Sequence, residues 1–264
     1  MRVDLYLSNN GYAESRQKAK GLIEEGLVTV NGKPITKPSH DILDTDTVKV
    51  TGSGLAYVGR GGLKLEGALR AFQFNPAGMV AADIGASTGG FTDCLLQNGA
   101  VKVYAVDSGT NQLHKKLKSD PRVISLENCN ARTLSSAIVP EPVSLAVMDL
   151  SFISQTCIYP ALVNILKEGA VLISLIKPQF EAGRKAINKN GLVRDKKIHE
   201  TVIMTVIEAA ASHRLYCEAV ALSPITGGDG NIEYLGKFVF QSDTPSGALP
   251  TRDEIHKVVF GVNT

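Results

Sequence analysis

Between residues 79 and 241 the chain alternates short, continuous apolar runs with segments of helical pattern. Runs without polar alternation predict strands that are buried on both faces. Strands alternating with helices predict a Rossmann-like, doubly wound α/β sheet of seven strands. The expected strands are "MVAADIG", "VKVYAVD", "RVISLE", "SLAVMDL", "AVLISLI", "CEAVALS" and "GKFVFQ", and the expected helices are residues 90–98, residues 154–166 and "KKIHETVIMTVIEAAASHR". The last two strands lack a long helix between them, which predicts an antiparallel closing hairpin.

Sheets of this kind bind ligands at the carboxyl ends of their strands, where the stretch "VAADIGASTGGFTDCLL" places a glycine-rich loop. A P-loop is excluded because no GK[ST] follows Gly90, and the loop fits a GxGxxG dinucleotide fingerprint poorly. S-adenosylmethionine fits better. Asp83 suits its ammonium group, Gly85 permits a tight turn and Gly89 allows close approach. The start of the next helix offers N–H groups to its carboxylate.

Asp107 ends the second strand, 24 residues after Asp83, where an acidic residue accepts the ribose hydroxyls of a cofactor. The alternative is an ordinary βα turn with Asp107 as a helix cap. Asn130, in the "ENCNAR" loop, is the expected adenine contact. The predicted cofactor-binding residues are Asp83, Gly85, Ala86, Ser87, Gly89, Phe91, Asp107, Asn130 and Asp149.

The first 50 residues have a different pattern of predicted elements from the rest of the chain. They predict a short helix that stops at Gly11, a second helix with Ser15 as its N-cap and Gly26 as its stop, and an Asn31-Gly32 hairpin followed by a third strand. We therefore expect a small α+β domain over 1–53, a linker over 54–62 and the larger domain over 63–264.

Basic residues gather on the second helix and near the hairpin, which fits either a solvated face or RNA contact. The order helix, "SRQKAKGLIEEGLVTVNGK", hairpin resembles the αL RNA-binding module of a small-subunit ribosomal protein, pseudouridine synthases and tyrosyl-tRNA synthetases. The resemblance implies that structured RNA is held through its shape and backbone charge. The predicted RNA-binding residues are Arg16, Lys18, Lys20, Lys33, Lys37 and Arg60.

Four charged residues stand where the larger domain is expected to carry its chemistry, namely Lys64, Asp149, Lys177 and Glu233. A lysine that ends the buried run "AVLISLI" is costly unless it is paired, although a surface lysine just outside the sheet is the simpler alternative. Asp149, on the neighbouring strand, is its expected partner.

Lys-Asp-Lys-Glu in this order is the tetrad of ribose 2′-O-methyltransferases of the FtsJ type. Together with "VGRGGLKLEGAL", "DIGASTGGFTDCLL", "MDLSFIS", "IKPQFE" and "GNIEY", the chain resembles the TlyA (haemolysin A-like) rRNA methyltransferase family over nearly its whole length. One departure is "VDSGTNQLH", where a second glycine is expected near Thr110 or Asn111.

The resemblance implies S-adenosylmethionine-dependent 2′-O-methylation of cytidine in ribosomal RNA of the large subunit, and also of the small one. Lys177 is then the expected base or the group that steers the oxygen lone pair, flanked by Lys64. Asp149 and Glu233 orient the two lysines. Ribosomal RNA or ribosomal subunits are the implied partners, and no metal is required.

Composition restricts the other functional classes. The 264 residues carry a net charge of +2 and four cysteines without a CxxC pair, which favours free thiols in a reducing compartment. The opening "MRVDLYLSNNGY" predicts no signal peptide and the apolar runs are too short to span a bilayer, so we expect a cytoplasmic protein. The alternatives are a non-catalytic RNA-binding assembly factor, a membrane-active haemolysin and, last, a nicotinamide-dependent oxidoreductase.

Overall fold

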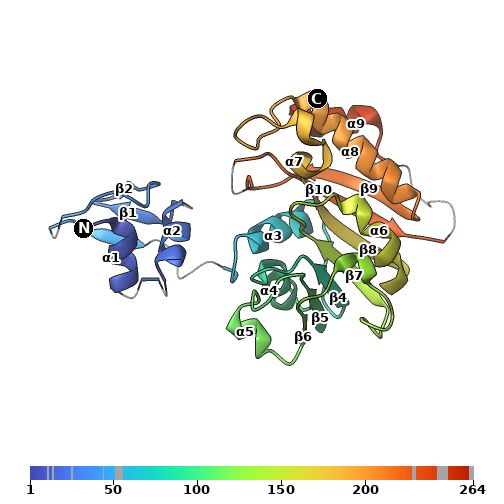
Figure 1. Ribbon diagram of the computed structural model, residues 1–264, viewed down its shortest axis with the longest axis horizontal. Coiled ribbons are helices and arrows are strands. Elements are labelled where there is room, and N and C mark those ends of the chain that lie inside the picture. The colour runs from blue at the N-terminus through green and yellow to red at the C-terminus, as the bar shows by residue number, and fades with distance from the viewer. Residues whose placement is uncertain are drawn as a thin grey trace. The chain divides into compact units, whose positions relative to one another are not determined.

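The chain divides by its contacts into two compact units, Met1–Ala56 and Tyr57–Thr264 (Figure 1). The computed structural model describes residues 1–10, 12–13, 15–24, 26–43, 45–50, 56–227, 230–242 and 249–261. The predicted stop at Gly11 and part of the predicted linker lie outside these residues. Residues 57–62 belong to the second unit, where Tyr57 is 6% exposed and a helix begins at Gly61.

The first unit packs two helices on a small antiparallel sheet of order β2-β1-β3. Its elements are α1 (Val3–Asn9), α2 (Arg16–Glu24), β1 (Val28–Val30), β2 (Lys33–Pro34) and β3 (Val48–Val50). The Ser15 side chain accepts the Lys18 N–H at 3.2 Å, as expected of an N-cap. Asn31 and Gly32 have φ of 52° and 78°, the positive values that a two-residue hairpin turn demands. This confirms the α+β expectation for the N-terminal part.

The second unit contains the predicted seven-stranded sheet, in the order β6-β5-β4-β7-β8-β10-β9. The strands are β4 (Val80–Ile84), β5 (Lys102–Val106), β6 (Val123–Leu126), β7 (Val143–Met148), β8 (Leu166–Ile176), β9 (Leu215–Leu222) and β10 (Tyr234–Phe240). The five strands β4 to β8 are parallel, and β10 runs antiparallel to both β8 and β9. The closing hairpin is therefore confirmed, with β10 inserted between β8 and β9.

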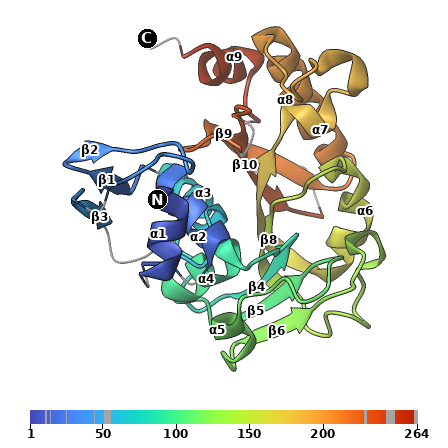
Figure 2. The same cartoon turned by 60° about the vertical axis from the view of Figure 1, so that its left-hand side comes forward.

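Helices cover both faces of the sheet (Figures 1 and 2). They are α3 (Gly61–Ala71), α4 (Gly90–Gln97), α5 (Lys115–Lys118), α6 (Tyr159–Leu162), α7 (Pro178–Glu181), α8 (Lys196–Ala211) and α9 (Arg252–Phe260). Apolar side chains of α3, α4 and α5 pack with one face, and those of α6, α8 and α9 with the other. The carboxyl ends of β4, β5 and β7 consequently meet at one edge between the two helical layers, which is where ligands bind in such sheets.

One predicted helix is broken. Residues 154–166 form a 3₁₀ turn (Gln155–Cys157), the short α6 and a second 3₁₀ turn (Val163–Ile165) rather than one continuous helix. Pro160 accounts for the break, because proline has no N–H to donate and is accommodated only in the first turn of a helix. It occupies that position in α6.

Candidate active site

Asp83 is the penultimate residue of β4, and its carboxyl group is only 1% exposed. Its Oδ2 accepts the N–H of Thr92 at 2.9 Å and the Thr92 hydroxyl at 2.7 Å. Its Oδ1 is buried without a hydrogen-bond partner among the described residues. Burial raises the pKa of Asp83 to about 7, with the nearby Asp149 carboxylate adding to the rise and Thr92 opposing it. A buried acceptor without a donor is rare in a folded protein and calls for a ligand or water.

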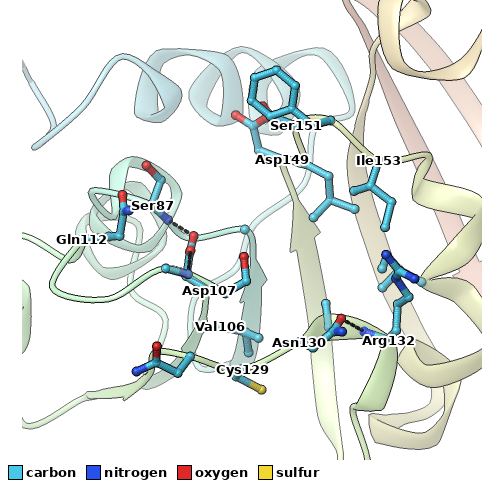
Figure 3. Close-up of a pocket in the computed structure, with 18 residues that line it drawn as sticks. Ser87, Val106, Asp107, Gln112, Cys129, Asn130, Arg132, Asp149, Ser151 and Ile153 are labelled. Carbon is cyan, nitrogen blue, oxygen red and sulfur yellow. Dashed lines mark hydrogen bonds between the residues drawn. The ribbon is translucent and has the colours of Figure 1, made fainter.

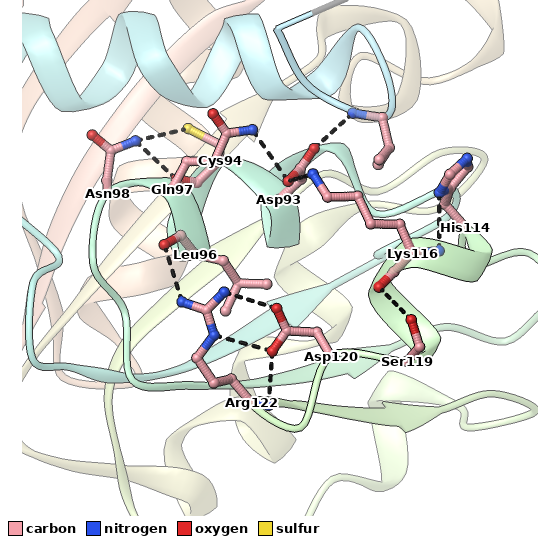
Figure 4. Close-up of polar contacts among 11 residues, drawn as sticks. Asp93, Cys94, Leu96, Gln97, Asn98, His114, Lys116, Ser119, Asp120 and Arg122 are labelled. Carbon is pink, nitrogen blue, oxygen red and sulfur yellow. Dashed lines mark hydrogen bonds and ion pairs between the residues drawn. The ribbon is translucent and has the colours of Figure 1, made fainter.

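The helix that supplies Thr92 is held in place by its next residue, Asp93 (Figure 4). Asp93 is 3% exposed, and its carboxylate accepts the Val58 N–H at 2.9 Å. Lys116 of α5 donates to the same carboxylate at 3.3 Å. These contacts hold α4 against α5 and against the segment that precedes α3. The N-terminus of α4 is therefore held in a fixed position opposite the end of β4.

Two glycines shape the loop between β4 and α4. Gly85 has φ of +85°, and a Cβ there would lie 2.5 Å from the carbonyl oxygen of Asp149. Gly85 therefore lets the loops after β4 and β7 approach each other. Gly89 has φ of +94°, and a Cβ there would lie 2.2 Å from a methyl of Leu117. Gly89 therefore allows α5 to pack closely against the loop, whereas from the sequence we expected Gly89 to allow the close approach of a ligand.

A cavity of about 690 Å³ opens beside this loop (Figure 3). Five of the predicted cofactor residues line it, namely Gly85, Ser87, Asp107, Asn130 and Asp149. The other four are not among the lining residues, namely Asp83, Ala86, Gly89 and Phe91. Ala86 and Phe91 are 6% and 4% exposed and belong to the core beneath α3 and α4.

Asp107 presents an oriented carboxylate to this cavity (Figure 3). Its Oδ2 accepts the Ser87 N–H at 2.7 Å and its Oδ1 accepts the Gly109 N–H at 2.7 Å. Each carboxylate oxygen has a second lone pair for a ligand hydroxyl. Asn130 lies across the cavity and accepts the Arg132 N–H at 3.1 Å, which fixes its amide. The arrangement suits a ligand with a diol at Asp107 and a polar ring edge at Asn130.

Lys177 and Asp149 form the first ion pair of the predicted tetrad. The Lys177 Nζ lies 2.5 Å from Asp149 Oδ1 and donates to the Ser151 hydroxyl at 3.2 Å. Lys177 is 7% exposed and its Nζ is 5.7 Å from the centre of the Phe180 ring. The alternative of a surface lysine is therefore wrong.

Lys64 and Glu233 form the second ion pair, with Lys64 Nζ 2.5 Å from Glu233 Oε2. They are 8% and 2% exposed. The two pairs are neighbours, because Tyr234 is paired with Ile176 in the β10–β8 ladder and so brings Glu233 alongside Lys177. The structure thus gathers all four residues at one edge, from α3, the loop after β7, the end of β8 and the start of β10.

The predicted RNA-binding residues are distributed over both units. Lys20, Lys33 and Lys37 are exposed, and Lys18 is half-buried. Arg16 donates from Nε to Asp4 Oδ2 at 2.9 Å, and the Asp4 side chain is fully buried. Arg16 therefore contributes to the stability of the fold, since loss of its charge would remove one ion-pair partner of the buried Asp4 carboxylate. The sixth residue, Arg60, is half-buried just before α3 in the second unit.

Two residues of the site were absent from the sequence prediction. Thr92 holds Asp83, and Ser151 accepts a hydrogen bond from Lys177. Ser151 lies two residues after Asp149 in the same "MDLSF" motif, so it could have been predicted from that motif. Thr92 is nine positions beyond Asp83, and the contact between them becomes visible only when the loop between β4 and α4 has folded.

Among the described residues, no group of three or more His, Cys, Asp or Glu side chains has the arrangement to hold a metal ion. In the part of the chain that the structure describes, no helix is both long enough and apolar enough to cross a membrane.

Comparison with known proteins places this geometry in a family. Residues 57–240 match the FtsJ-like methyltransferase family and residues 1–48 match the S4 domain. The chain is 40% identical over 259 residues to the 16S/23S rRNA (cytidine-2′-O)-methyltransferase TlyA of Mycobacterium tuberculosis, covering 98% of this chain and 97% of the relative. It is 43% identical over 240 residues to Hemolysin A of Brachyspira hyodysenteriae, covering 90% of this chain and 100% of the relative.

Among solved structures, a protein from Streptococcus thermophilus described as a hemolysin is 44% identical, with a TM-score of 0.78. The match covers 99% of this chain and 94% of that one. With a paired Lys-Asp-Lys-Glu tetrad, a seven-stranded sheet and an S4 domain, the chain belongs to the TlyA family of FtsJ-like methyltransferases.

Proposed function

We propose that this protein transfers a methyl group from S-adenosylmethionine to the ribose 2′-oxygen of a cytidine in ribosomal RNA. The observation that carries the proposal is the pair of neighbouring ion pairs, Lys177–Asp149 and Lys64–Glu233, at the edge of the sheet that also forms the cavity. The relatives named as rRNA (cytidine-2′-O)-methyltransferases support the substrate, and they include a Campylobacter jejuni protein that is 34% identical over 258 residues.

The described residues fit S-adenosylmethionine. Asp83 does not itself line the cavity, but its partnerless Oδ1 lies close in sequence to the lining residue Gly85 and is a buried acceptor suited to the ammonium of the amino-acid tail. Asp107 offers one lone pair on each oxygen to the ribose diol, and Asn130 suits the adenine edge. The N–H of Thr92 is already taken by Asp83, so it is not available to the cofactor carboxylate. When bound, the cofactor supplies an electrophilic methyl group.

The residues of the tetrad then align the acceptor oxygen. Asp149 Oδ1 lies 2.5 Å from the Lys177 Nζ and holds this group in a fixed position, which suits the role of steering the oxygen lone pair. Lys177 would direct one lone pair of the 2′-oxygen towards the methyl carbon, and the hydroxyl proton would pass to solvent as the new O–C bond forms and the C–S bond of the donor breaks. Lys64, held by Glu233, adds a second cation beside the same edge.

We further propose that residues 1–53 dock RNA and that residues 63–264 transfer the methyl group, together with residues 57–62 of the expected 54–62 linker, which belong to the second unit. The S4 match supports RNA binding by the first unit. The exposed Lys20, Lys33 and Lys37 supply cations for the phosphates of structured RNA. A cytoplasmic site of action follows from the proposed substrate.

Lys177→Met tests the proposal. We expect this change to reduce methyl transfer to ribosomal subunits by about 10²-fold or more, because the 2′-oxygen loses the group that aligns it. Binding of S-adenosylmethionine, measured by calorimetry, is expected to stay nearly intact. The matched control is Lys167→Met, which replaces an exposed lysine near the other end of β8 and is expected to change neither measurement. Equal loss of transfer and of cofactor binding in Lys177→Met would show that Lys177 supports the fold instead.

A further inference from the structure

A strongly basic surface follows the active-site lysine along the chain. The basic segment, residues 184–197, contains six lysines and arginines and a single acid, Asp195. The six are Arg184, Lys185, Lys189, Arg194, Lys196 and Lys197, and all are exposed. The chain as a whole carries a net charge of only +2, so this segment concentrates positive charge in one place.

Nearby acids do not neutralise the basic segment. Asp195 accepts the Lys197 N–H at 2.9 Å with its Oδ1 and so caps α8. Glu181, just before the segment, is turned away and accepts the Ser154 hydroxyl at 2.5 Å and the Gln155 N–H at 2.9 Å. Among the residues that the structure describes, none of the six cations forms an ion pair with a carboxylate.

The loop within the basic segment is fixed to the residues that lead into β10, which include Glu233. Asn231 is 4% exposed, donates to the Gly191 carbonyl at 3.0 Å and accepts the Val193 N–H at 3.3 Å. The buried ring of His199 lies 2.8 Å from the Val193 carbonyl and 2.9 Å from the Tyr234 hydroxyl. Two buried polar side chains thus hold an exposed basic loop against the start of β10.

The same segment is also tied to Lys177 through the chain. Arg184 is seven residues beyond Lys177, so at most about 25 Å of extended chain separates them. The short helix α7 occupies part of this stretch and packs beside α8, as Figures 1 and 2 show. The basic segment is therefore connected to Lys177 by a short stretch of chain and to the start of β10 by hydrogen bonds.

We propose that the basic segment binds the backbone phosphates of the RNA strand on either side of the target nucleotide. This inference rests on the proposed function. Phosphate contacts set the register and orientation of a nucleic acid, whereas base contacts read its sequence. A ribose whose 2′-oxygen must meet a methyl carbon in line needs its flanking phosphates held, and exposed cations on a loop that is fixed near the start of β10 can meet that need.

The test is the double variant Arg184→Gln/Lys189→Gln, with Lys167→Gln/Lys257→Gln as its matched control. Both remove two positive charges from exposed side chains of the second unit. Affinity for a naked ribosomal RNA transcript and for assembled subunits is measured across a salt series, together with melting temperature and calorimetric binding of S-adenosylmethionine. We expect the double variant to bind the transcript about tenfold more weakly, with a salt slope shallower by about 1.5. The control is expected to match the unmodified protein.

The outcomes separate this inference from the proposed function. An affinity and a salt slope equal to those of the control overturn the inference. Weaker binding to assembled subunits with unchanged binding to the naked transcript also overturns it, because the partner is then an acidic protein surface. Methyl transfer is measured separately in the unmodified protein. Its absence would contradict the proposed function, whereas the salt series on the naked transcript would still decide the role of the basic segment.

Discussion

Asp83 is a carboxyl group enclosed at the end of β4, with Thr92 on one oxygen and no hydrogen-bond partner among the described residues on the other. Its pKa of about 7 means that the unliganded protein is half protonated there near neutral pH. An ammonium next to Oδ1 favours the ionised form and would lower the pKa. Under the proposal that Asp83 holds the ammonium of the cofactor, cofactor binding and ionisation of Asp83 would be coupled.

This coupling predicts a pH dependence of cofactor affinity. Between pH 6 and pH 8 the ionised fraction of a group with a pKa of about 7 rises about tenfold. We expect binding of S-adenosylhomocysteine, which has the same amino-acid tail as the donor, to tighten by about this factor, as measured by calorimetry. Asp83→Asn should bind more weakly and lose that component of the pH dependence. Equal pH dependence in the two proteins would show that Asp83 does not hold the ammonium.

The same group makes the unliganded protein less stable as pH rises. The folded-state pKa of Asp83, about 7, lies above its usual value of 3.8. Its contribution to stability is therefore fully present below about pH 4 and is lost as pH rises through about 7. The loss is on the order of 4 kcal/mol at most. Chemical denaturation at pH 5 and pH 8 should show a smaller loss for Asp83→Asn than for the unmodified protein. A loss of the same size in both would contradict the prediction.

At the scale of elements, the strands were the easiest part to predict. Each of β4, β5 and β7 is buried on both faces, so its residues form a continuous apolar run. The short helices α5 and α7 have only four residues each, too few to show a period of 3.6. Helix α9 was missed although Thr251 and Glu254 form a capping box, a signal that the sequence did contain.

Gly85→Ala tests the contact between the loops after β4 and β7. The added methyl would meet the Asp149 carbonyl at 2.5 Å, and the residue would keep a positive φ. We expect a loss of stability larger than the roughly 1–3 kcal/mol of backbone strain alone, and reduced methyl transfer because Asp149 must shift. Gly78→Ala is the control, with φ of +75° and no atom within 4 Å of the new Cβ. If the two variants lose equal stability by chemical denaturation, the contact is unimportant.

At the scale of the whole molecule, the order of motifs predicted two functional parts, but the side-chain partners could not be predicted. Lys64 and Glu233 are 169 positions apart, and only the folded sheet brings them together. The Arg16–Asp4 pair was likewise not foreseen, because the charge pattern of α2 does not show that a buried carboxylate lies opposite. Local patterns specify elements, whereas pairing depends on how the elements pack.

Lys20→Glu is a clean test of RNA docking by the first unit. Lys20 is exposed on α2, whereas replacing Arg16 would also disturb the buried Asp4. We expect weaker binding to ribosomal subunits and a shallower salt dependence, with cofactor binding unchanged. Lys49→Glu, an exposed lysine on β3, makes the same change of charge in the same unit. Equal effects of the two variants would indicate that RNA responds to the overall charge of the first unit rather than to a docking surface on α2.

The proposed function depends on the Lys177–Asp149 pair preparing a ribose oxygen for methylation. The most direct measurement incubates purified ribosomal subunits with tritiated S-adenosylmethionine and the protein, and then maps the labelled nucleotide. We expect the label in 2′-O-methylcytidine, and we expect it to disappear with Lys177→Met. Label on a base, or no label from a folded protein that binds the cofactor, would contradict it.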